Sequence, residues 1–113
     1  MRILGKSKIL KLKKKNLGNK KLYGEIDKLI DDLEAFNPET DSLSLNRPDA
    51  DRVHADGFYF FDIHIHITLI LVEFDDESEC TIVWAGTHQE YESVFKNNKS
   101  TIEKWLRKNN YID

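Results

Sequence analysis

The feature that most constrains the fold is the apolar stretch Phe58–Phe74, which is rich in aromatic and β-branched residues. Such residues favour strands. The odd positions from 59 to 71 are all apolar. The even positions carry a polar centre, made of Asp62, His64, His66 and Thr68. Because a strand usually has about 5–6 residues, we expect a bend or hairpin near His64–Ile67. The alternation predicts a sheet with one apolar face and one partly polar, open face.

Two helices are predicted before this stretch. Apolar residues recur with a 3.6-residue period in the second of them, at Leu22, Ile26, Leu29, Ile30, Leu33 and Phe36. That helix ends at Asn37–Pro38, because the residue before proline avoids the α region. The first helix spans Lys6–Lys15 after a short strand, Arg2–Leu4, so the two helices form an αα-hairpin. Residues 37–57 are expected to be a surface connector.

A further strand is predicted at Cys80–Ala85, with Ile82 and Trp84 on one face and Val83 on the other. Capping-box spacing at Thr87–Glu90 and again at Ser100–Glu103 predicts two short helices at the end of the chain. The pattern as a whole is that of a single α+β domain over residues 1–113.

The charge is distributed unevenly. The first 21 residues carry nine of the 17 basic residues and none of the 20 acidic ones. Three interpretations of this basic arm stay open: it binds phosphate, it binds an acidic partner, or it is a solvated end of the chain. Cys80 is the only cysteine, and neither a secretory signal nor a transmembrane run is evident, so we expect a cytoplasmic protein.

Two groups of residues are candidates for a functional site. On a straight strand Asp62, His64 and His66 share one face, where they suit acid–base chemistry, a metal site completed by His88 or Glu90, or simple exposure to solvent. His88 stands at the start of a predicted helix, where backbone amides bind anions, and Tyr91 lies one turn on. The alternative is that His88 only follows a cap and Tyr91 packs in the core.

The segment Gly86-Thr87-His88-Gln89-Glu90-Tyr91 resembles the "F-x-G-T-H-x-E-Y-D" segment of HigB family toxins. The stretches Pro48–Asp51, Asp56–Ile63 and Thr68–Phe74 resemble that family's "P-S-A-D", "G-x-x-V-F-N-I" and "Y-R-L-I-V-x-I-x-F". The likeness covers roughly residues 1–95. One departure is the family's "G-G-N-K-Y-R" hairpin, which becomes His64–Thr68 and has no arginine.

The resemblance implies a RelE-like α+β fold, in which a helical hairpin packs on an antiparallel-rich sheet, with residues 96–113 as a C-terminal helical extension. It implies a toxin of a type II toxin–antitoxin system: a metal-independent endoribonuclease, or mRNA interferase, that cuts messenger RNA on the ribosome. The implied partners are mRNA, the ribosome and a HigA-like helix-turn-helix antitoxin. No cofactor and no membrane partner are expected.

This hypothesis assigns roles to particular residues. The candidate catalytic residues are His88, His66, Tyr91 and His64. The candidate RNA-binding residues are Lys13, Lys14, Lys15, Lys20, Lys21, Arg47 and Arg52. Two alternatives stay open: a non-catalytic member of the same fold that binds RNA or protein, and a metal-dependent hydrolase that uses His64, His66 and His88.

Overall fold

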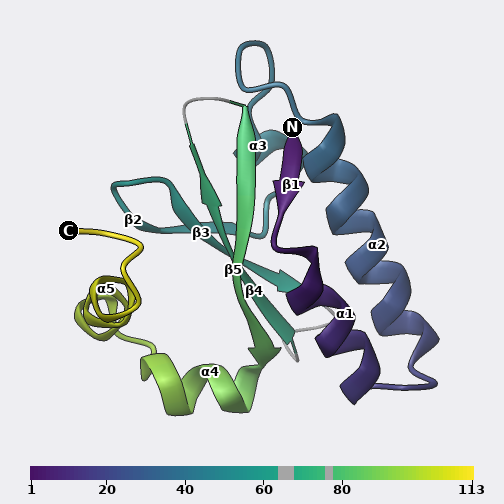
Figure 1. Ribbon diagram of the computed structural model, residues 1–113. Coiled ribbons are helices and arrows are strands. Elements are labelled where there is room, and N and C mark those ends of the chain that lie inside the picture. Colours follow the sequence, from purple (N-terminus) through teal and green to yellow (C-terminus); the bar gives the residue numbers. More distant parts are fainter. Residues whose placement is uncertain (64–67, 76–77) are drawn as a thin grey trace.

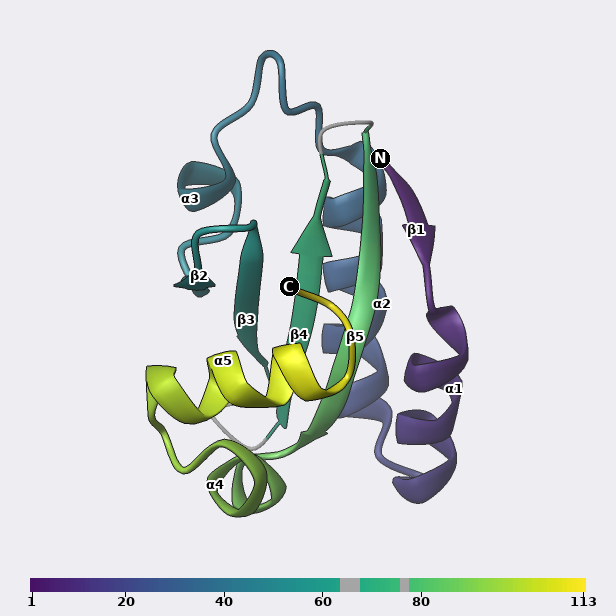
Figure 2. The ribbon, with the colours of Figure 1, turned by 60° about the vertical axis from the view of Figure 1, so that its left-hand side comes forward.

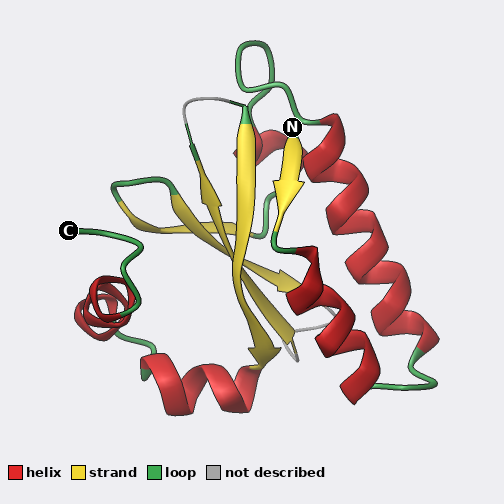
Figure 3. Cartoon of the chain, in the orientation of Figure 1, coloured by secondary structure: helices red, strands yellow, loops and turns green. Residues whose placement is uncertain are grey.

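The computed structural model describes residues 1–63, 68–75 and 78–113. A five-stranded mixed sheet has the order β1-β5-β4-β3-β2, in which β1 runs parallel to β5 and the other pairs are antiparallel (Figure 1). The strands are β1 (Arg2–Leu4), β2 (Ala50–His54), β3 (Phe58–Ile63), β4 (Thr68–Phe74) and β5 (Glu79–Thr87). The helices are α1 (Lys6–Lys15), α2 (Lys20–Ala35), α3 (Leu43–Asn46), α4 (His88–Phe95) and α5 (Lys99–Lys108). The predicted α+β class is therefore confirmed, and Figure 3 shows the helices on either side of the strands.

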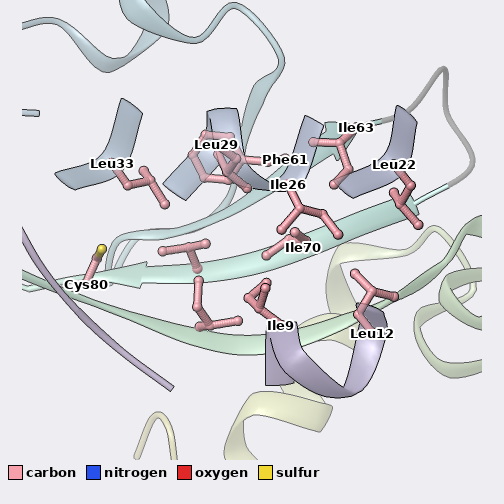
Figure 4. Close-up of a cluster of buried hydrophobic side chains, with 12 residues drawn as sticks. Ile9, Leu12, Leu22, Ile26, Leu29, Leu33, Phe61, Ile63, Ile70 and Cys80 are labelled. Atoms are coloured by element: carbon pink, nitrogen blue, oxygen red, sulfur yellow. The ribbon is translucent and has the colours of Figure 1, made fainter. Parts of the chain in front are cut away.

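Helices α1 and α2 cover one face of the sheet, as the predicted helical hairpin requires. The apolar stripe of α2 is buried against the strands, and Asn19 caps the helix by accepting a hydrogen bond from the amide of Leu22. Figure 4 shows side chains of α1 and α2 meeting those of the strands in this core. Cys80 belongs to it, and burial raises the pKa of its thiol to about 11. The thiol therefore stays protonated at neutral pH, as expected of a core residue.

The opposite face of the sheet is also covered, which corrects the expectation of an open, partly polar face. Helices α4 and α5 pack there over a second apolar core, and Figure 2 shows the sheet between the two helical layers. This face is apolar because of the register between β3 and β4, which pairs Phe61 with Ile70. Odd positions of β3 thus share a face with even positions of β4, so the alternation does not continue across the turn. Residues 64–67, including His64 and His66, lie outside the described residues.

The predicted connector was wrong in part. Residues 37–57 contain the short helix α3 and the edge strand β2, which pairs with β3 and has a bulge between Arg52 and His54. The strand was hard to recognise because Ala50–His54 holds charged and small residues rather than a run of β-formers. The partner strand β3, not the local sequence, makes it a strand.

A β-bulge in β5 corrects the prediction for Trp84. Leu71 pairs with Trp84 and Val72 with Ile82, so Val83 is an extra residue. As a result Ile82 lies in the core under α1 and α2, whereas Trp84 packs against the second apolar core, under α4 and α5. The second predicted cap also differs, because Asn98, not Ser100, caps α5. Within the described residues no helix is long and apolar enough to cross a membrane.

Candidate functional site

The start of α4 is fixed by the predicted capping box. The Thr87 hydroxyl accepts a hydrogen bond from the amide of Glu90, and the Glu90 carboxylate accepts one from the amide of Thr87, both at 3.1 Å. Because both bonds close on the last residue of β5, the strand passes directly into the helix. His88 is therefore held at the first position of α4, with Tyr91 one turn further on.

One cleft beside this turn brings His88 and Tyr91 together, and we call it the aspartate cleft. Its volume is about 310 Å³. Its lining residues are Asp49, Asp51, Phe60, Asp62, Leu69, His88, Tyr91 and Asn97. The rings of His88 and Tyr91 have centroids 5.7 Å apart. Tyr91 is only 8% exposed, whereas 47% of the His88 side chain is accessible to solvent. The histidine is thus open to a ligand and the tyrosine forms part of the wall.

The surroundings of Tyr91 disfavour ionisation of its phenol. Burial, followed by the negative charges of Asp51 and Glu92, raises the pKa of Tyr91 above its usual value. Its hydroxyl donates a hydrogen bond to Oδ1 of Asn97 at 2.9 Å. At neutral pH this group is therefore a hydrogen-bond donor pointing at the cleft edge. Glu92 Oε1 lies 3.9 Å from His88 Nε2, one turn along α4.

A second cleft lies on the other side of the same turn, and we call it the lysine cleft. It has a volume of about 230 Å³ between α1 and the end of β5. Its lining residues are Lys8, Lys11, Leu12, Lys15, Trp84, Ala85, Gly86 and Glu90. Gly86 is required here, because a Cβ atom at this position would lie 2.7 Å from two ring carbons of Trp84. The segment 86–91 therefore contributes residues to both clefts.

The predicted RNA-binding lysines occupy different environments. Lys15 lines the lysine cleft, and Lys14, Lys20 and Lys21 are exposed outside it. Lys13 forms an ion pair with Asp27 at 2.6 Å. Lys8 and Lys11 also line the lysine cleft and were not among the predicted residues. Their spacing with Lys15, at offsets of three and seven, places all three on one side of α1 and was readable in the sequence.

The two predicted arginines are held by the protein itself. Arg47 is 7% exposed and its guanidinium contacts Asp32 at 3.1 Å and Asp49 at 2.6 Å. It therefore joins α2 to the segment before β2. Arg52 donates a hydrogen bond to the carbonyl of Ala55 at 2.9 Å, within the turn after β2. Neither arginine lines the lysine cleft or the aspartate cleft.

The histidine pair of the sequence analysis cannot be placed, since His64 and His66 lie outside the described residues. Asp62, which was grouped with them, lines the aspartate cleft with His88. Across residues 1–63, 68–75 and 78–113, no three His, Cys, Asp or Glu side chains gather in a way that could hold a metal ion. The structure thus joins two of the four candidate catalytic residues.

Comparison with known proteins leaves the site to be judged on its geometry. No family model matches the sequence, and no curated protein matches it either.

Proposed function

We propose that this chain is an RNA-cutting toxin of a type II toxin–antitoxin pair, with a RelE-like fold similar to that of HigB family toxins. The observation that carries the proposal is the shared cleft of His88 and a protonated Tyr91. Support also comes from the order of elements, in which a strand and a helical pair precede the antiparallel strands. The resembling segment Gly86–Tyr91 contains both residues.

The proposed reaction is attack by the ribose 2′-hydroxyl on the adjacent phosphorus. His88 accepts the 2′-proton, the bond from phosphorus to the 5′-oxygen breaks, and the products carry a 2′,3′-cyclic phosphate and a 5′-hydroxyl. Tyr91 turns its single hydroxyl proton from Asn97 Oδ1 to a phosphate oxygen, and this hydrogen bond stabilises charge on the pentavalent phosphate. His66 is the proposed acid for the leaving oxygen. It stands in the segment His64–Thr68, where the sequence departs from the family, and it lies outside the described residues.

The test is expression of the chain without an antitoxin, with growth and transcript cleavage as the readouts. Removal of one general acid or base costs about 10²–10⁴-fold in rate, so His88→Ala should lose most cleavage and most growth inhibition. Tyr91→Phe keeps the ring and removes the donor, and we expect a smaller loss. Gln89→Ala is the matched control, because Gln89 is exposed on the same turn and lines neither cleft. If the His88→Ala and His66→Ala variants both cut and inhibit like the wild type, the assignment is wrong.

The three carboxylates of the aspartate cleft favour a second candidate function. Asp49, Asp51 and Asp62 line the cleft that holds His88, and Asp49 is paired with Arg47. The charge of the exposed Asp51 repels a phosphate. The second candidate is therefore a non-catalytic member of the same fold that binds RNA or protein. Normal growth and intact transcripts at high expression of the folded wild type support this candidate and contradict the enzyme.

A further inference from the structure

The lysine cleft presents three positive charges on one side. Lys8, Lys11 and Lys15 lie along the same face of α1, and the cleft they border is closed by β5. Within the described part of the chain, none of the three ammonium groups has a carboxylate within 4.0 Å. By contrast Lys6 pairs with Glu34 and Lys13 with Asp27. The cleft lysines are thus available for an anion, as are the exposed Lys14, Lys20 and Lys21, but only the former border a cleft.

An indole lies among these charges. Trp84 borders the cleft, and it is held from behind by edge-to-face contacts with Phe60 and Phe95. Gly86 leaves the space that the ring occupies. Proteins often bind single-stranded nucleic acids with lysines interleaved with an aromatic ring. The lysines contact the phosphates and the ring stacks on a base. An acidic peptide would use the charge but has no use for the indole.

The size of the cleft points to one unit of a longer polymer. Sites for whole small molecules have about 300–1,000 Å³, and the lysine cleft has about 230 Å³. It is open to solvent along α1, so a chain can enter and leave it. The one carboxylate on its wall, that of Glu90, is engaged with the amide of Thr87.

We propose that the lysine cleft is a binding site for a phosphodiester of single-stranded RNA, with the three lysines on the phosphate oxygens and the Trp84 indole against the neighbouring base. The choice of RNA rests on the proposed function. The site lies across the first turn of α4 from the aspartate cleft. The RNA strand therefore reaches His88 from the side of the three lysines. The aspartate cleft, which holds His88 and Tyr91, then receives the ribose and the phosphate at the cleavage site.

The first experiment measures binding without cleavage. The probe is a fluorescein-labelled 2′-O-methyl hexanucleotide, which cannot be cut because the attacking hydroxyl is blocked. Affinity is measured by anisotropy between about 50 and 200 mM salt for wild type, Lys8→Ala/Lys11→Ala/Lys15→Ala, and Lys14→Ala/Lys20→Ala/Lys21→Ala. Both triple variants lose the same net charge, so they differ only in whether the lysines line the cleft.

We expect the cleft variant to bind at least about 10-fold more weakly at low salt. The slope of log affinity against log salt should become shallower by about 2, since each phosphate contact on a single strand contributes about 0.7. The control variant should change less than about 3-fold. Equal losses in the two variants, or no binding by folded wild type, would overturn the proposal. Binding without any cleavage of the natural strand would leave the cleft assignment standing and contradict the enzyme.

The second experiment tests the indole. In a Trp105→Phe background Trp84 is the only tryptophan, because the chain has two. Trp105 stacks on Tyr111 and is not part of the cleft. The hexanucleotide should quench the remaining fluorescence on binding, whereas an abasic strand of equal charge should bind without that quenching. Equal signals from both strands, or equally tight binding of a glutamate peptide with the same lysine dependence, would contradict the RNA site.

Discussion

The lysine cleft and the aspartate cleft share one turn of helix and carry opposite charge. Three lysines and one engaged glutamate line the first, and three aspartates line the second. A phosphate chain is therefore attracted on one side of Gly86–Tyr91 and repelled on the other. The difference teaches that a net charge of −3 says little about what the surface at His88 can bind. What matters is the side from which a ligand approaches.

The two clefts also differ in how they are built. All three lysines of the lysine cleft come from one helix, α1. The aspartate cleft collects Asp51 from β2, Asp62 from β3 and Leu69 from β4 around the start of α4. The first is a local arrangement and the second depends on the pairing of three strands. Mutations should therefore affect the lysine cleft mainly through charge and the aspartate cleft through both charge and packing.

Reversal of charge should have the largest effect and should act in opposite directions in the two clefts. The double variant Lys11→Glu/Lys15→Glu should lower the affinity for the 2′-O-methyl hexanucleotide by about 100-fold at low salt. Asp51→Lys should raise it by about 3- to 10-fold, because Asp51 is exposed and screened by solvent. Anisotropy measures both, and both differences should shrink as salt is added. A loss of affinity in Asp51→Lys would break the comparison, since the repelling side would then not repel.

Crowding of the Trp84 ring at the lysine cleft should have the next largest effect. Gly86→Val places a side chain where the Trp84 ring lies, 2.7 Å from a Cβ, so we expect a loss of about 1–3 kcal/mol in the free energy of unfolding. The matched control is Gly24→Ala in α2, where a Cβ meets open space. That change should stabilise the protein by about 0.5–1 kcal/mol, because alanine favours the helix. Urea denaturation measures both. Equal stability of Gly86→Val and the wild type would show that the indole moves freely.

The same contrast explains what the sequence could predict. Lys6–Lys15, the α2 stripe and the Thr87 cap depend on neighbours within a few residues, and all three were predicted from spacing. His88 and Tyr91 are one turn apart, so their meeting was also predictable. Both features depend on local geometry alone.

Long-range pairing accounts for what the sequence did not predict. The strand Ala50–His54 exists because β3 pairs with it, and the bulge at Val83 moved Trp84 to the other face. The partnership of Arg47 with Asp32 and Asp49 likewise joins segments that only the fold brings together. No local pattern distinguishes such an arginine from one that binds phosphate. Asp62 was singled out beside His64 and His66, but its place in one cleft with Asp49, Asp51 and Tyr91 was missed, because these residues come from separate segments that only the fold brings together.

The smallest expected effect tests whether the aspartate cleft keeps Tyr91 protonated. Burial is the first cause of its raised pKa, and the charge of Asp51 is the second. Asp51→Asn should therefore lower the pKa of Tyr91, and ring-carbon NMR titration, with Tyr91→Phe to assign the signal, measures it. Because the folded-state pKa is raised, Tyr91 favours folding below pH of about 10, and this contribution is lost as pH rises through the folded pKa.

The linked stability should change in the same direction. Compared with wild type, Asp51→Asn should lose less stability between pH of about 8 and 11, by under about 1 kcal/mol because Asp51 is exposed. Glu92→Gln is the second arm, since Glu92 is the remaining negative charge that raises the pKa of Tyr91. If neither variant lowers that pKa, burial alone holds the phenol protonated. The carboxylates would then act only by repelling phosphate, and the donor role of Tyr91 would be independent of the charge that separates the two clefts.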